Sequence, residues 1–121
     1  MKLSFKKFLK SIENAFKGIK YVFLQQNFFL MVLITIGTLI LGFWLQVLYF
    51  EWLIIIFLIG FILSLEILNT VLEKTLDFLE PYISDNIKMI KDLIAGAVLL
   101  SCLTALILGF TIFLPKIILK F

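Results

Sequence analysis

The chain has 121 residues, 63% of them hydrophobic and 16% charged, with a mean hydropathy of +1.17 and a formal net charge of +3. Soluble domains carry about 25% charged residues, so this composition indicates an integral membrane protein and excludes a separate soluble catalytic domain. The sequence has no histidine, which excludes a histidine metal site and removes the usual acid–base group of neutral pH. The one cysteine, Cys102, can form no disulfide within the chain.

Residues 1–20 are predicted to form an amphipathic helix on the membrane surface. Apolar residues recur there at spacings of three and four, with lysines on the other side: Phe5, Phe8, Leu9, Ile12, Phe16 and Ile19. Such a helix lies among lipid head groups with its lysines toward anionic lipid. The mixing of lysines with apolar residues does not favour nucleic-acid binding. A signal peptide is the competing interpretation, but the next apolar run is too long and lacks a cleavage site.

Three apolar stretches follow, each long enough to cross a hydrocarbon core of about 30 Å. We expect transmembrane helices at about residues 28–47, 52–79 and 92–114, the last ending at Pro115 because proline cannot continue helical hydrogen bonding. Residues 80–91 then form the only substantial loop. The predicted fold is a single all-α membrane domain covering the whole chain, with three spans after a surface helix.

The lysine distribution predicts the orientation of the chain. Nine of the eleven lysines lie on one side of a three-span topology: Lys2, Lys6, Lys7, Lys10, Lys17, Lys20, Lys74, Lys88 and Lys91. Lys116 and Lys120 lie on the other side. We therefore expect a multi-pass protein of the plasma membrane with a cytoplasmic N-terminus, and a polar region facing cytoplasmic ATP and Mg²⁺.

The third span has small residues at every fourth position, a spacing that lets helix backbones approach closely: Ala97, Ser101, Ala105 and Gly109. A three-helix monomer also has little interior in which to shelter polar side chains. Both observations favour an oligomer, although small residues can fall at this spacing by chance.

The second span carries a stripe of polar residues. Glu66, Asn69, Glu73 and Asp77 fall within roughly 80° of arc on an α-helix. An ionisable residue at membrane depth costs about 2.5–3.5 kcal/mol on insertion scales, so this stripe indicates a functional site. Glu66, the deepest, suits a general base, and Glu73 suits Mg²⁺ binding. Asn69 could orient either carboxylate. Asp77 could equally be a solvated residue, and Glu66 could be a neutral acid hydrogen-bonded to a neighbouring helix.

A lysine and an aspartate, Lys91 and Asp92, open the third span. The lysine could neutralise phosphate charge, and the aspartate suits a helix N-terminus. A helix cap explains the same two residues. The sequence has no Walker motif and no G-x-G-x-x-G, which excludes a soluble nucleotide-binding fold.

The sequence from Glu66 to Glu73 (EILNTVLE), followed by Lys91 to Val98 (KDLIAGAV), resembles the signature of the small prokaryotic diacylglycerol kinase family. The resemblance continues from residues 16–20 (FKGIK) to residues 113–116 (FLPK). This ending and residues 51–53 (EWL) are similar to the branch of Gram-positive undecaprenol kinases.

The resemblance implies a homotrimer of three-span subunits, with active sites shared between neighbours, that transfers the γ-phosphoryl group of Mg-ATP to a lipid hydroxyl. The lipid would be undecaprenol or diacylglycerol. The implied roles are general base for Glu66 with support from Asn69; metal ligand for Glu73 and Gln26; nucleotide contact for Lys91, Asp92, Lys17 and Asp77; and lipid-substrate contact for Glu66, Lys7 and Lys10.

One position departs from the family pattern. Eight residues after Gly18 the family has a glutamate that helps to hold a metal ion, and here this residue is Gln26, followed by Asn27. An amide oxygen can bind Mg²⁺ but brings no charge, so metal or ATP affinity should fall unless Glu13 or Asp77 compensates. The chain could therefore be a weakened or catalytically silent kinase. From a different class, a small proton-coupled transporter could use Glu66 as its carrier carboxylate.

Overall fold

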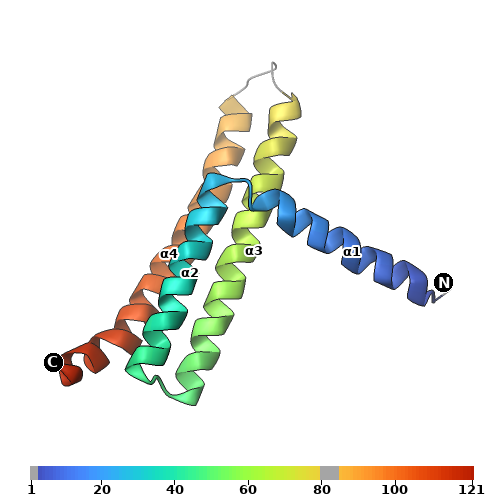
Figure 1. The fold of residues 1–121 in the computed structure, drawn as a ribbon. Helices are drawn as coiled ribbons and strands as arrows, with labels where there is room; N and C mark the ends of the chain where they lie inside the picture. The colour runs from blue at the N-terminus through green and yellow to red at the C-terminus, as the bar shows by residue number, and fades with distance from the viewer. Residues whose placement is uncertain (1–2, 80–84) are drawn as a thin grey trace.

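The structure, a computed structural model, describes residues 3–79 and 85–121. Over these residues it consists of four helices without a strand: α1 (Phe5–Val22), α2 (Gln26–Leu45), α3 (Tyr49–Leu79) and α4 (Asp85–Lys120). The last three run up and down beside one another, and α1 projects away from them (Figure 1). Each of α2, α3 and α4 is long and apolar enough to cross a membrane. The predicted all-α fold with three spans is confirmed.

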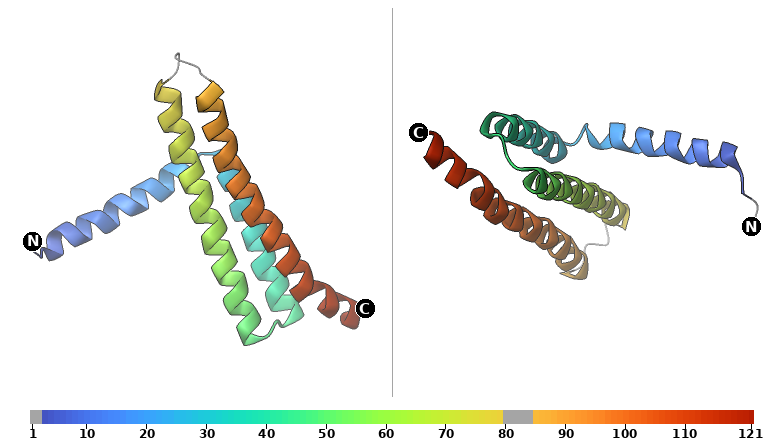
Figure 2. Two further views of the ribbon diagram at one scale, coloured as in Figure 1. Left: turned by 180° about the vertical axis from the view of Figure 1, so that it is seen from behind. Right: turned by 90° about the horizontal axis from the view of Figure 1, so that it is seen from below.

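The first helix has the character of a surface helix. Ser4 caps its N-terminus, because the side-chain oxygen accepts a hydrogen bond from the backbone N–H of Lys7 at 3.3 Å. The apolar residues of α1 before Val22 are exposed, with Phe5 at 75% and Phe16 at 68%, whereas Val22 at the end of the helix is buried. Both views in Figure 2 show α1 extending away from the bundle. Such a helix can place its apolar side in a lipid head-group layer.

A tight turn joins α2 to α3. Gln46 adopts a left-handed backbone conformation with φ 54°, and the N–H groups of Gln46 and Val47 donate to the carbonyls of Phe43 and Gly42 at 3.4 and 3.3 Å. This pattern ends a helix by satisfying its last carbonyl groups. Glu51 then accepts a hydrogen bond from the N–H of Leu48 at 2.9 Å and so caps the start of α3.

The hydrophobic core lies at the same end of the bundle as this turn, which we call the distal end. It is formed by buried residues of α2, the turn, α3 and α4: Leu45, Val47, Ile55, Ile112 and Phe113. Trp52 packs against this core, and its ring lies 4.9 Å from that of Phe43. The Trp52 ring lies directly against Gly42, so the lack of a side chain at Gly42 lets this ring of α3 pack on the backbone of α2.

The last helix is longer than predicted at both ends. It begins at Asp85, within the predicted loop, and continues through Pro115 to Lys120, so the expected helix end at Pro115 is wrong. Proline removes one backbone hydrogen bond and crowds the carbonyl four residues earlier, which can kink a helix without ending it. The C-terminal part of α4 changes direction in Figures 1 and 2.

Contacts beyond Pro115 explain why the helix continues. Lys116 Nζ lies 2.8 Å from Glu51 Oε1, and Lys120 Nζ lies 4.4 Å from the centre of the Trp44 ring. Lys120 also donates to the Trp44 carbonyl at 3.3 Å. These contacts hold the last turns of α4 against the distal end. The sequence around Pro115 does not predict them, because the partner residues lie on other helices.

The four small residues at every fourth position of α4 differ in burial. Ser101 is buried, Ala105 and Gly109 are partly covered, and Ala97 is exposed. The Ser101 hydroxyl donates to the Val98 carbonyl at 2.7 Å. Of these four residues, only Ser101 is fully buried within the bundle, and a Cβ atom at Gly109 would meet nothing within 4 Å.

The contact between Gly42 and Trp52 makes a testable prediction. A Cβ atom at Gly42 would lie 2.7 Å from the tip of the Trp52 ring, so Gly42→Ala should destabilise the fold by about 1–3 kcal/mol through overpacking. The matched control is Gly37→Ala on the same helix, where a Cβ atom meets nothing within 4 Å. Thermal unfolding in detergent micelles measures both. Equal melting temperatures for the two variants would contradict the packing described here.

Candidate active site

The polar stripe of α3 runs from a buried end to an exposed end. The fractional exposure of Glu66 is 4% and that of Asn69 is 6%, whereas Glu73 is exposed and the Asp77 side chain is 58% exposed. Because α3 is helical throughout, the four residues share one side of it. The stripe therefore leads from the interior of the bundle to its polar end, opposite the distal end.

Asn69 connects the two glutamates of the stripe. Its Nδ2 donates to Glu73 Oε1 at 3.5 Å, and its side chain also interacts with the Glu66 carboxylate. The Asn69 Oδ1 atom is buried and accepts no hydrogen bond within the described residues. Thr70 donates instead to the backbone carbonyl of Glu66 at 3.0 Å. A buried amide oxygen without a donor is costly, which is expected where a ligand supplies the missing partner.

The start of α4 lies beside the exposed end of the stripe. Lys91 Nζ is 2.8 Å from Asp77 Oδ1, and the Lys91 side chain is only 31% exposed. The pair joins α3 to α4 across 14 residues of sequence. It places one cation next to the carboxylates of α3 and gives Asp77 a specific partner.

Asp92 lies on a different side of α4. It is 70% exposed and pairs with Lys88 at 3.6 Å. Both residues line an open groove of about 750 Å³ along α4, with Asp85 and Gly96. Consecutive residues of a helix point about 100° apart, so Lys91 faces α3 while Asp92 faces the groove. The structure does not bring Asp92 to the stripe within one subunit.

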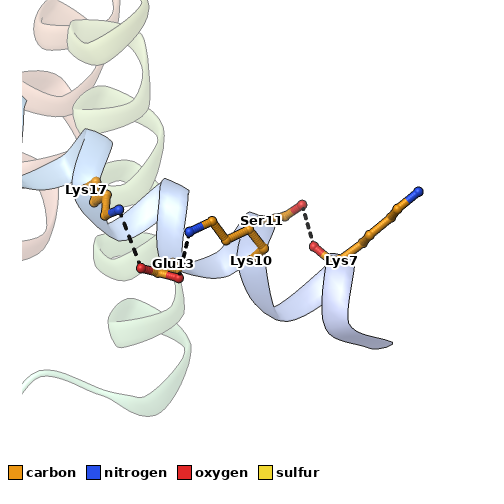
Figure 3. Close-up of polar contacts among 5 residues, drawn as sticks. All are labelled: Lys7, Lys10, Ser11, Glu13 and Lys17. Carbon is orange, nitrogen blue, oxygen red and sulfur yellow. Dashed lines mark hydrogen bonds and ion pairs between the residues drawn. The ribbon is translucent and has the colours of Figure 1, made fainter. Parts of the chain in front are cut away.

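The lysines of α1 form a separate group. Glu13 pairs with Lys10 at 3.4 Å and with Lys17 at 3.5 Å, while the side chain of Lys7 extends away from this cluster (Figure 3). Ser11 donates to the Lys7 carbonyl at 3.1 Å. All of these side chains are on the projecting helix, so a single subunit does not bring Lys7 or Lys10 to the stripe.

Gln26 is the first residue of α2 and is exposed. Helix α2 begins part way along α3, so both α3 and α4 extend beyond it toward the polar end (Figure 1). Residues 3–79 and 85–121 contain no group of three or more acidic, cysteine or histidine side chains able to hold a metal ion. Oxygen donors toward this end of the described chain include the Glu73 carboxylate and the amide oxygens of Asn69 and Gln26. Such a set suits Mg²⁺, which commonly takes one or two carboxylates together with substrate phosphates.

Sequence reasoning missed the partners of several charged residues. It did not pair Asp77 with Lys91, nor Glu51 with Lys116. One signal was available for the second pair: Glu51 and Lys116 are opposite charges predicted on the same side of the membrane, each at the end of a long apolar stretch.

Comparison with known proteins identifies the chain. Residues 13–113 match the prokaryotic diacylglycerol kinase family. The chain is also 38% identical to the undecaprenol kinase of Bacillus subtilis (strain 168) over 112 residues, which covers 92% of this chain and 91% of that protein. No solved structure matches. The family match includes the whole polar stripe and the Lys91–Asp77 pair, and it favours a kinase over a proton-coupled transporter. This chain belongs to the prokaryotic diacylglycerol kinase family and is an ATP-dependent lipid kinase of the membrane.

Proposed function

We propose that this kinase transfers the γ-phosphoryl group of ATP to the hydroxyl of undecaprenol and so forms undecaprenyl phosphate. The observation that carries the proposal is the likeness to an undecaprenol kinase over nearly the full length of both chains. Diacylglycerol is the second candidate acceptor, because it gives the matching family its name.

Glu66 is the proposed general base. As the lipid oxygen bonds to the γ-phosphorus, the hydroxyl proton passes to the Glu66 carboxylate and the bond from the γ-phosphorus to the leaving ADP oxygen breaks. The 4% exposure of Glu66 supports this role, since a base inside a span can meet a hydroxyl that is presented by a membrane lipid. Asn69 interacts with the Glu66 carboxylate and donates to Glu73, which limits the rotation of both acids.

Lys91 is proposed to neutralise charge on the nucleotide phosphates. Phosphoryl transfer depends mainly on positioning and electrostatic stabilisation, and a lysine next to the stripe supplies both. Asp77 holds Lys91 through the 2.8 Å ion pair. Asp92 and Lys17 are the further proposed nucleotide contacts, and Lys7 and Lys10 are proposed to contact the lipid head group.

Mg²⁺ is the proposed cofactor. Glu73 and the amide oxygen of Gln26 would hold it, and when bound it neutralises phosphate charge. Gln26 brings no charge to this site, so the nucleotide phosphates must provide more of the binding than they would beside a glutamate.

The active subunits are proposed to form a homotrimer in the plasma membrane, with the N-terminus and the active site on the cytoplasmic side. Lysine bias supports the orientation. The outward direction of Asp92 supports a shared site, because Asp92 does not reach the stripe of its own subunit. Exposed apolar residues over α2, α3 and α4 leave ample surface for lipid and for other subunits.

Glu66→Gln should abolish most phosphotransfer. Loss of a general base lowers turnover by about 10²–10⁴-fold, and glutamine keeps the shape of the side chain. Phosphate transfer from radiolabelled ATP to undecaprenol in mixed micelles measures the effect. Glu66→Asp, which keeps a carboxylate at this position, is the control and should retain more activity than Glu66→Gln. Turnover like that of the wild type in Glu66→Gln would remove the proposed mechanism.

Gln26→Glu should lower the KM for Mg-ATP by roughly 3–10-fold, on the order of 1 kcal/mol, because a second carboxylate strengthens metal binding. Gln25→Glu places the same charge one residue earlier, about 100° around the helix start, and is the matched control. Titration of ATP at fixed excess Mg²⁺ provides the KM values. If both variants behave alike, Gln26 does not hold the metal.

The choice of lipid is tested by a direct comparison. Undecaprenol and diacylglycerol are offered at equal mole fraction in mixed micelles with radiolabelled ATP, and the phosphorylated products are separated. We expect undecaprenyl phosphate to form at least about 10-fold faster, equivalent to 1.4 kcal/mol of discrimination. A preference for diacylglycerol would overturn the substrate assignment while leaving the kinase intact, and labelling of neither lipid would contradict both assignments.

A further inference from the structure

Two ion pairs join α3 to α4 within the described residues, one at each end of this helix pair. Lys91 meets Asp77 at the polar end, and Lys116 meets Glu51 at the distal end, both at 2.8 Å. The other described ion pairs lie within a single helix. The two contacts are 26 residues apart on α3 and 25 residues apart on α4, so one antiparallel register of the helices satisfies both.

The distal pair, Glu51 with Lys116, is sheltered from solvent. The two side chains are 11% and 23% exposed, compared with 54–79% for the pairs within helices. The same oxygen of Glu51 also accepts the N–H of Leu48, which fixes the carboxylate to the first turn of α3. Removing one member of such a pair leaves a sheltered charge without its partner, so the fold strongly favours keeping these two side chains together.

Between the two pairs, the packed residues of α4 are mostly apolar or small, among them Val98, Ser101 and Ile112. Apolar packing is non-directional, and the ridges of a helix repeat with each turn of about 5.4 Å. Packing of this kind tolerates sliding of one helix along another better than an ion pair does. Setting a register is the best-attested use of buried ionic groups.

We propose that Glu51 and Lys116 are positioning residues for phosphoryl transfer: their ion pair sets the register of α4 along α3 and thereby holds Lys91 beside the polar stripe. The inference rests on the proposed function, because Lys91 is taken as a nucleotide contact. Catalysis is sensitive to displacements of about 1 Å, so loss of a pair far from the site should still affect nucleotide binding.

The test uses the full-length chain in mixed micelles. Glu51→Gln and Lys116→Met should each raise the KM for ATP by about 3-fold or more, equivalent to roughly 0.7 kcal/mol. Exchange of the two charges, Glu51→Lys with Lys116→Glu, should recover at least half of the loss. The recovery is incomplete because the bond from Leu48 to Glu51 is not restored.

Two controls separate register from stability. Gly42→Ala disturbs the same end without touching the pair and should lower the melting temperature while the KM for ATP stays unchanged. Lys120→Met removes a neighbouring cation that contacts Trp44 and should also leave the KM unchanged. An unchanged KM in Glu51→Gln and Lys116→Met, or an equal rise in Gly42→Ala, would overturn the proposal.

A distance measurement tests the register without relying on activity. Spin labels at the exposed positions Lys74 and Lys88, in a Cys102→Ser background and diluted with unlabelled subunits, report the separation of α3 and α4 at the polar end. Glu51→Gln should shift or broaden the distance distribution, by up to about one turn of 5.4 Å, and the exchanged pair should restore it. An unchanged distance distribution in Glu51→Gln would overturn the register proposal, whether or not the wild type is active. A shifted distribution together with an inactive wild type would overturn the proposed function and leave the register proposal standing.

Discussion

In a lipid environment a polar group must find its hydrogen-bond partner inside the protein, and this constraint organises the whole molecule. The threonines of the spans meet it locally: the hydroxyls of Thr35, Thr38 and Thr104 each donate to the carbonyl four residues earlier. Glu66 and Asn69 cannot be satisfied in this way. Both side chains are buried on α3, and the Asn69 amide oxygen has no hydrogen-bond donor among the described residues. This part of α3 is therefore where a bound ligand would supply a missing hydrogen bond.

The two ends of the bundle differ in composition: one contains the clustered hydrophobic core and the other contains the candidate active site. The distal end contains the hydrophobic core, the tight turn and the sheltered pair of Glu51 with Lys116. The polar end contains exposed carboxylates and lysines, with buried apolar side chains such as Leu76 beside them. Chemistry on a lipid and a soluble nucleotide needs an open, polar region, which packs poorly. The clustered hydrophobic core therefore lies at the opposite end of α3 and α4.

Periodicity in the sequence predicted what a single helix determines by itself. The surface helix, the number of spans and the sharing of one side by Glu66 and Glu73 all follow from spacing and hydropathy. The continuation of α4 beyond Pro115 could not be predicted in this way, because it depends on contacts of Lys116 and Lys120 with residues on other helices. The pairing of Lys91 with Asp77 was missed for the same reason: the pattern gives the side of each helix but not the register between two helices.

The division of Lys91 and Asp92 between two sides of α4 has a consequence for the assembly. Adjacent residues of a helix diverge by about 100°, so both cannot face the stripe of one α3. Lys91 faces its own stripe, and Asp92 faces the open groove of α4. If both contact one nucleotide, the groove of one subunit must lie near the stripe of another. The proposed shared active site would make use of this divergence, because one helix α4 would then contribute Lys91 to its own stripe and Asp92 to a neighbouring one.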